Sequence, residues 1–215
     1  QLFAQVTNPP IDSTRESIVM SLGTGVGAEG NLLTETPQHA HQLVMDQPIL
    51  RNAELETLRS VSTDVFRAHT IDITWPIDDG PAGLQKRLAD VCDEATDHIA
   101  AGINILVLSD RATGPERAPI PSLLAVSAVH HHLVREGTRL RAGLVLESGE
   151  PREVPHFAVL IGYGASAVNP YLMLDTVDDL ARDGRIAGVV DPDDAEQRIV
   201  KALGKSLLKT ISKMG

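Results

Sequence analysis

The sequence predicts an α/β fold built from repeated βα units around a mostly parallel sheet. Two apolar runs, at residues 105–108 and 143–146, lack the polar alternation of a half-exposed strand, which is typical of strands covered on both faces. Helical patterns follow these runs in regular alternation. The four or five units that fit into 215 residues fall short of a complete barrel, which takes about 250 residues. We therefore expect an incomplete, barrel-related (β/α) architecture or an open sheet.

Residues 1–60 are expected to form a helix-and-loop region. A short helix is predicted over residues 13–22 with Ser13 as its cap, and four closely spaced glycines predict a loop over residues 23–38. A short strand is expected at residues 42–45. Asn52 is the expected cap of a helix that runs to Leu58.

Residues 61–215 are expected to hold the repeated βα units. Alternation of Ile71 and Ile73 predicts a strand over residues 69–74. The clearest helix is predicted over residues 83–101, because apolar side chains recur every three or four positions and Gly102 provides a stop. Further strands are expected at 104–109, 141–148 and 165–169, and further helices at 122–136, 154–163, 171–183 and 193–214.

Composition narrows the classes of partner. The chain carries 19 basic and 29 acidic side chains, a net charge of −10, which argues against nucleic acid or an anionic membrane surface as a partner. No apolar run approaches the roughly 20 residues that span a bilayer. Cys92 is the sole cysteine, so a buried thiol in a reducing compartment is expected, and we expect a cytoplasmic protein. Because the chain opens at Gln1 and closes straight after a helical pattern, we interpret residues 1–215 as one domain excised from a longer polypeptide.

Polar residues end the central strands and are the best site candidates that position alone provides. They are Ser109, Asp110, Glu147, Ser148 and Asn169. In parallel α/β folds ligands bind at the carboxyl ends of the strands. The alternative, which the sequence favours, is that these side chains cap the loops and helices that follow. Position does not assign a catalytic role to any of them.

Three local motifs resemble known binding sites but lack the flanking structure or the spacing that such sites require. Residues 25–30 spell G-x-G-x-x-G, but a helical pattern precedes the string and none follows it, so no dinucleotide site is predicted. Residues 130–132 are three consecutive histidines, whose side chains point about 100° apart on a helix and cannot meet at one metal ion. No metal site is predicted. Lysines recur every fourth residue from Lys201 to Lys213. We interpret them as a solvated or interface face of a helix. A contact for phosphate or for an acidic partner is the less favoured alternative.

A rigid polar segment lies near the start of the chain. Pro9 and Pro10 fix the backbone and bias Asn8 towards an extended conformation. The Thr7 hydroxyl and Asn8 amide can therefore be held in place to bond a small polar species. A plain turn before the first helix is the alternative.

Five long blocks are distinctive in their order along the chain: Q-L-F-A-Q-V-T-N-P-P-I-D, I-L-V-L-S-D-R, R-A-P-I-P-S-L-L-A-V-S-A-V-H-H-H-L, residues 147–172 and G-K-S-L-L-K-T-I-S-K-M-G. Together they resemble the central domain of the large subunit of glutamate synthase. The resemblance implies a domain between a glutaminase domain and an FMN-binding, iron–sulfur synthase domain, which together convert glutamine and 2-oxoglutarate into two glutamates. It further implies that the segment with Val6, Thr7, Asn8 and Ile11 belongs to an ammonia tunnel.

The resemblance places the chemistry outside this chain. It implies no catalytic residue and no cofactor here, with FMN and the cluster held elsewhere in the parent protein. The implied partners are the other domains of the same polypeptide and, as an open alternative, a small electron-delivering subunit. Two alternatives stay open: a small-molecule-binding, barrel-like enzyme domain that uses the strand-end residues, or a pure inter-domain interface module.

Overall fold

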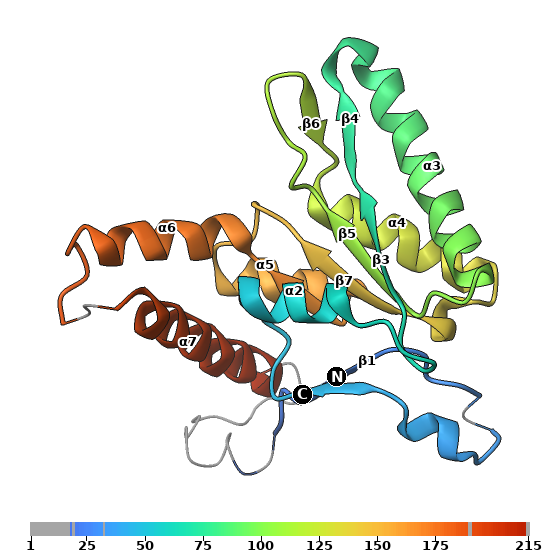
Figure 1. Ribbon diagram of the computed structural model, residues 1–215, viewed down its shortest axis with the longest axis horizontal. Helices are drawn as coiled ribbons and strands as arrows, with labels where there is room; N and C mark the ends of the chain where they lie inside the picture. Colours follow the sequence, from blue (N-terminus) through green and yellow to red (C-terminus); the bar gives the residue numbers. More distant parts are fainter. Residues whose placement is uncertain (1–17, 19, 32, 189–190, 214–215) are drawn as a thin grey trace.

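A four-stranded parallel sheet lies at the centre of the computed structural model, which describes residues 18, 20–31, 33–188 and 191–213. The strands follow the order β3 (Ala68–Asp72), β5 (Ile105–Ser109), β7 (Gly143–Glu147) and β8 (Ala167–Asn169). Within these residues the sheet is open and does not close into a barrel (Figure 1). The predicted α/β class with repeated βα units is confirmed, and the open sheet is the architecture formed.

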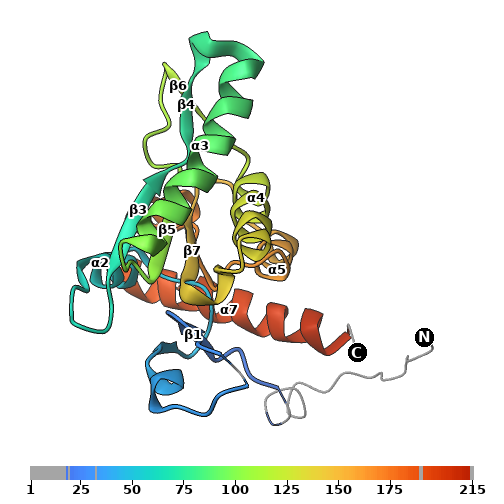
Figure 2. The ribbon, with the colours of Figure 1, turned by 90° about the vertical axis from the view of Figure 1, so that its right-hand side faces the viewer.

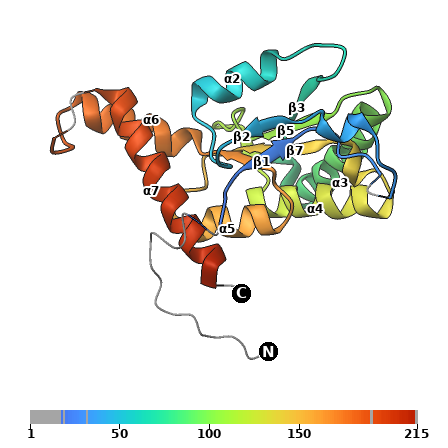
Figure 3. The same ribbon diagram turned by 90° about the horizontal axis from the view of Figure 1, so that it is seen from below.

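Helices cover both faces of the sheet (Figure 3). The first face packs against α3 (Gly80–Ala100), α4 (Ser122–Arg135) and α5 (Val154–Gly162). The second face packs against α2 (Asn52–Ser60) and a two-stranded ribbon of β1 (Thr24–Val26) and β2 (Leu43–Met45). Beside the sheet, α6 (Tyr171–Arg182) packs on α7 (Pro192–Lys213), which also contacts α5. Short 3-10 turns lie at Pro37–Ala40, Ile77–Asp79 and Arg139–Arg141.

Alternate side chains of each central strand enter two separate cores. Leu106 and Leu108 of β5 belong to the larger core beneath α3, α4 and α5. Ile105 and Val107 of the same strand belong to the smaller core beneath α2. All four are fully buried, because successive side chains of a strand point to opposite faces and both faces are covered. This double burial accounts for the uninterrupted apolar runs in the sequence.

The outer edge of β8 is protected by the segment before α2. The Val168 nitrogen donates to Pro48 O at 2.8 Å, and the Leu50 nitrogen donates to Val168 O at 2.9 Å. These bonds continue the parallel ladder by one bridge, between Ile49 and Val168. An edge that is paired in this way offers fewer open backbone groups to another chain.

The predicted loop over residues 23–38 is wrong at its start, because residues 24–26 form β1. Gly25 pairs with Val44 in the antiparallel ribbon. A Cβ at Gly25 would lie 2.1 Å from Gln42 Oε1, so glycine lets the Gln42 side chain cross the strand. Gly25 of the G-x-G-x-x-G string therefore lies in a strand, and among the described residues no α-helix lies between the string and α2. The predicted helix over residues 13–22 falls mostly outside the described residues, and Met20 to Leu22 are not helical.

A small antiparallel arm, which the sequence did not predict, includes a strand between the expected strand over residues 104–109 and the expected helix over residues 122–136. The expected strand over residues 69–74 divides into β3 and β4 (Thr74–Pro76), and β4 pairs with β6 (Arg117–Pro119). Both strands end in proline, which lacks a backbone donor and is tolerated at strand ends. The arm extends beyond the ends of β3 and β5 beside the first turns of α3 (Figure 1).

Two helix starts differ from the prediction. Helix α3 begins at Gly80, three residues earlier than expected, because Pro81 lies within its first turn, where a missing N–H is tolerated. The cap of α2 is Arg51, not Asn52, and the Arg51 nitrogen donates to Glu54 Oε2 at 2.8 Å. Asn52 instead directs its side chain towards Asp175 and Asn169.

No helix in the described part of the chain is long and apolar enough to cross a membrane.

Gly143, the first residue of β7, allows the ribbon to approach the sheet. A Cβ at this position would lie 2.6 Å from Val26 Cγ1 and 2.7 Å from the Gly27 nitrogen. These distances are too short for any carbon atom, and the second neighbour is backbone. The close contact between β1 and β7 therefore depends on a glycine here.

We expect Gly143→Ala to lower the free energy of unfolding by about 1–3 kcal/mol, because the added methyl group overpacks the ribbon. Gly114→Ala is the matched control, because a Cβ there meets no atom within 4 Å. It should change stability by less than about 0.5 kcal/mol. Urea unfolding of both variants measures the difference, and equal values would contradict the proposed close approach.

Candidate functional site

Three of the strand-end candidates lie side by side on the face of the sheet that α2 covers. The parallel register aligns Ser109 with Glu147 and Glu147 with Asn169. All three side chains are buried. Because they share a face with Val107 and Val145, they point towards α2 and not towards α4.

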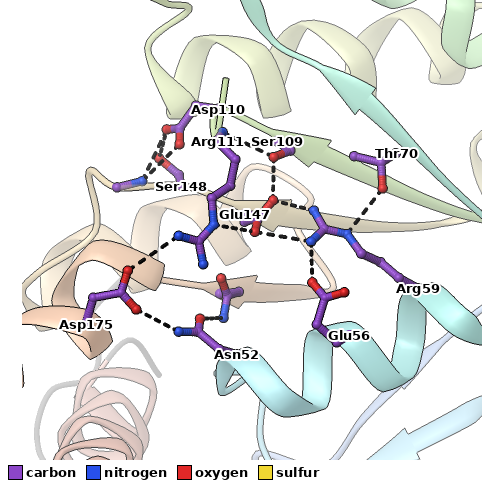
Figure 4. Close-up of polar contacts among 12 residues, drawn as sticks. Asn52, Glu56, Arg59, Thr70, Ser109, Asp110, Arg111, Glu147, Ser148 and Asp175 are labelled. Atoms are coloured by element: carbon purple, nitrogen blue, oxygen red, sulfur yellow. Dashed lines mark hydrogen bonds and ion pairs between the residues drawn. The ribbon is translucent and has the colours of Figure 1, made fainter. Parts of the chain in front are cut away.

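Glu147 carries a carboxylate that is 1% exposed, and two arginines neutralise it. Arg59 of α2 contacts both carboxylate oxygens of Glu147: its Nη1 donates to Oε1 at 3.3 Å, and its Nη2 pairs with Oε2. Arg111 donates through Nε to Oε1 at 3.1 Å, and the Ser109 hydroxyl donates to Oε2. Figure 4 shows the two guanidinium groups reaching Glu147 from different sides. A buried charge is tolerated only when it is paired and hydrogen-bonded in this way.

Arg59 is held in place by further bonds. Its Nη1 donates to Glu56 Oε1 at 2.6 Å, and its Nε donates to Thr70 Oγ1 at 3.3 Å. Burial alone would lower the pKa of the Arg59 guanidinium, but the hydrogen bonds to Glu147 and Glu56 outweigh it and raise that pKa. Arg59 therefore stays charged and ties α2 to β7.

The polar network continues from Arg111 to the far end of the sheet. Arg111 lies 4.1 Å above the ring of Tyr171 and pairs with Asp175 at 3.4 Å. Asp175 Oδ1 accepts from Asn52 Nδ2 at 2.9 Å, and Asn52 Oδ1 accepts from Asn169 Nδ2 at 3.0 Å. The chain of contacts thus joins β7, α2, α6 and β8 (Figure 4).

Asp110 and Ser148 follow Ser109 and Glu147 in sequence and form a second, separate group. The Ser148 hydroxyl donates to Asp110 Oδ2 at 2.6 Å, and the Gly149 nitrogen donates to both carboxylate oxygens, at 3.1 and 3.2 Å. Burial raises the pKa of the Asp110 carboxyl, while hydrogen bonds from Ser148, Tyr171 and Gly149 partly offset that rise. Burial and the proximity of Asp110 raise the pKa of the Tyr171 hydroxyl.

In these arrangements, the polar side chains at the strand ends form hydrogen bonds within the chain and are not available to bind a ligand. Every strand-end candidate is 5% exposed or less, and each bonds to a neighbour within the chain. Asn169 Oδ1 is the exception, since it is buried without a partner among the described residues. Cavities of about 610, 440 and 300 Å³ lie elsewhere: between β2 and α2, between α3 and α4, and beside the start of α5. Side chains of the described residues therefore enclose these five residues at the C-terminal ends of the strands.

Sequence reasoning missed the residues that close this edge. Arg59 lies 88 positions before Glu147, and nothing in the pattern of α2 connects the two. Arg111 could have been found, because it follows Ser109 and Asp110 directly at the strand end. The tunnel candidates Val6, Thr7, Asn8 and Ile11 lie outside the described residues.

Comparison with known proteins identifies the family. A model of the glutamate synthase central domain matches residues 1–215. The chain belongs to the glutamate synthase central domain family. It is 40% identical to the glutamate synthase [NADPH] large chain of Bacillus subtilis, 42% to the glutamate synthase [NADH] of Schizosaccharomyces pombe and 41% to the chloroplastic ferredoxin-dependent glutamate synthase of Spinacia oleracea. Each match covers the whole chain but 14%, 10% and 14% of these relatives, respectively.

The composition of this central domain does not fit an iron–sulfur cluster. Such clusters are held by several cysteine thiolates, and the chain has Cys92 alone, buried within α3. Burial raises the pKa of the Cys92 thiol, which disfavours the thiolate. Among the described residues, no group of three or more His, Cys, Asp or Glu side chains is arranged to hold a metal ion.

The three consecutive histidines of this central domain have separate structural partners. His130 Nδ1 accepts a hydrogen bond from Arg139 Nε at 3.0 Å, and His132 Nε2 lies 2.9 Å from Thr96 Oγ1. His131 is exposed and meets His130 edge to face. Arg139 also donates to Gly164 O at 2.8 Å, so His130 helps fix the loop before β8.

We expect Glu147→Ala to cost about 3–5 kcal/mol of stability, because Arg59 and Arg111 would lose the buried carboxylate that they share. Glu56→Ala is the matched control: it removes another carboxylate from Arg59, but one that is 68% exposed. That change should cost about 1 kcal/mol or less. Urea unfolding measures the stability of both variants. Similar losses of stability would show that the buried ion pair contributes no more than the exposed one.

Acidification should destabilise the domain through His130. Burial, Arg139 and His131 lower the pKa of His130, so the folded chain resists a proton that the unfolded chain binds. Stability therefore falls as the pH drops below about 6.5, the ordinary pKa of histidine. His130→Gln keeps an acceptor for Arg139 and should flatten the loss between pH 7 and 5. His131→Gln, the exposed control, should leave it unchanged; the reverse result would contradict this assignment.

Proposed function

We propose that the chain is the domain that connects the glutaminase domain to the FMN and iron–sulfur synthase domain of a glutamate synthase, and that it forms part of the wall of an ammonia tunnel. The family match over residues 1–215 supports a central-domain role. The chain spans about 10–14% of the length of its relatives, which leaves room for the catalytic domains elsewhere. We treat residues 1–215 as one domain, with residues 1–60 and 61–215 as its two regions.

The proposed overall reaction converts glutamine and 2-oxoglutarate into two glutamates. Hydrolysis of glutamine gives one glutamate and ammonia. The ammonia condenses with 2-oxoglutarate, with loss of water, and two electrons and two protons reduce the imine to the second glutamate. FMN and the iron–sulfur cluster would be held by other parts of the parent protein. The protein would act in the cytoplasm, and a small electron-delivering subunit is one candidate partner.

The observation that carries this proposal is that the chain's own side chains close the C-terminal ends of the parallel strands. In an enzyme of this architecture, the strand ends leave polar groups free for substrate. Here Glu147 is saturated by Arg59, Arg111 and Ser109, and Asp110 is saturated by Ser148 and Gly149. Such an edge supports a domain that positions neighbours over one that binds its own substrate.

The electron donor differs among the relatives, although their similarity to this chain does not. Relatives named for NADPH, NADH and ferredoxin are 40%, 42% and 41% identical to it. We infer that this domain serves the same purpose with each donor, and that the donor is recognised elsewhere in the assembly.

The tunnel candidates are Val6, Thr7, Asn8 and Ile11. Two prolines follow Asn8, and a residue before a proline is biased towards an extended conformation. A conduit for ammonia must exclude bulk water, because a protonated intermediate would be stranded. Small apolar side chains with a few fixed polar groups suit such a wall.

We expect Thr7→Leu or Asn8→Leu, in the full-length enzyme, to uncouple glutamine hydrolysis from glutamate formation. The larger side chain would block passage, so ammonia would escape to solvent and more than one glutamine would be consumed per 2-oxoglutarate. The ratio of the two substrates consumed measures this. Thr176→Leu, at an exposed threonine of α6, is the control and should leave the ratio at one. A ratio of one in all variants would refute the tunnel assignment.

A further inference from the structure

The last helix carries a row of lysines that form no ion pair with a carboxylate of the described residues. We propose that this lysine stripe, formed by Lys201, Lys205, Lys209 and Lys213 of α7, docks onto an acidic surface of another domain of the same polypeptide. The inference rests on the part of the proposed function that makes this chain one domain of several. It does not depend on an ammonia tunnel.

Lysine is concentrated on this helix to an unusual degree. The chain has five lysines, and four of them form the stripe. The rest of the chain holds 15 basic against 29 acidic side chains. A strongly acidic domain thus presents a local basic surface on one helix, and such a surface favours a partner of opposite charge.

The stripe faces away from the domain. Leu203, Gly204 and Leu207 are the buried residues of this part of α7, whereas all four lysines are exposed. Side chains four residues apart lie on the same face of a helix. The lysines therefore form one continuous line on the side opposite the packed face.

Within the described structure, no carboxylate lies within ion-pair distance of these lysines, although other cations of the same kind are paired. Lys86 of α3 pairs with Asp90 at 2.6 Å, and Arg198 of α7 pairs with Asp194 at 2.7 Å. Like charges at four-residue spacing destabilise a helix. The helix dipole favours cations in the last turn, which helps Lys213 but not Lys201 or Lys205. An acidic partner would offset this repulsion along the whole line.

An exposed apolar residue lies on the other side of α7 from the stripe. Ile211 is 37% exposed, and it lies four residues after Leu207 on the packed side of the helix. Figure 2 shows the end of α7 extending past α5. Ile211 is therefore not part of the lysine stripe, and the choice of occupant rests on charge.

Net charge favours another domain over a second copy of this chain. Two copies would each carry −10 and repel one another at long range. The relatives devote 86–90% of their length to other parts, because the match covers only 10–14% of them. A docking partner within the same polypeptide also needs no independent encounter.

Zero-length carbodiimide cross-linking of the full-length protein tests the proposal, because it joins lysine to a carboxylate only when the two are in ion-pair contact. Cross-links from Lys201, Lys205 or Lys209 to acidic residues outside positions 1–215 are expected. Absence of cross-links would overturn the proposal, as would cross-links confined to this domain. Cross-links between isotopically distinct copies would also overturn it and assign the surface to self-association.

Charge reversal provides a second measurement. Lys205→Glu in the full-length protein should increase the rate of proteolytic nicking at the borders of this domain by about threefold or more, because a docked domain shields its borders. Lys86→Glu is the matched control, with the same change of charge on α3, and should leave the rate unchanged. Lys205→Arg should also leave it unchanged. Equal rates for Lys205→Glu and Lys86→Glu would contradict docking, whatever the glutamine ratio shows.

Discussion

Glu147 places a buried negative charge at the C-terminal end of a central strand, and the arrangement of α2, β7 and α6 depends on how that charge is neutralised. Desolvation of a carboxylate costs several kcal/mol unless cations and donors surround it. Arg59 supplies a two-pronged contact from α2, and Arg111 supplies a second cation from the strand end. Arg111 in turn reaches Asp175 on α6. One buried charge thus fixes three elements that are far apart in sequence.

The same alternation that forms the two cores also divides the strand ends. Ser109, Glu147 and Asn169 point towards α2, while Asp110 and Ser148 form a group with the Gly149 backbone. Each group satisfies its own polar atoms, with the exception of Asn169 Oδ1. The polar groups are therefore enclosed at the C-terminal ends of the strands, where related architectures bind ligands. Closed strand ends are consistent with the connecting role proposed above.

The sequence predicted the central strands well, because an uninterrupted run such as Ile105 to Leu108 requires cover on both faces. It could not predict β1 or the pairing of β4 with β6, since these short strands contain glycine and proline and exist only through tertiary contacts. Asn52 reads as a helix cap, but the network takes its amide and Arg51 occupies the cap. The strand-end residues followed from position, whereas Arg59 did not, because its partner is remote in the chain.

The strand ends are closed by the chain's own side chains, so they should bind no substrate of their own. Calorimetric titration of residues 1–215, with folding checked by circular dichroism, tests this expectation most directly. Glutamine, 2-oxoglutarate and FMN should each give no saturable heat at concentrations up to about 1 mM. Saturable one-to-one binding of any of the three, abolished by Arg111→Ala, would contradict the account and make the strand ends a ligand site.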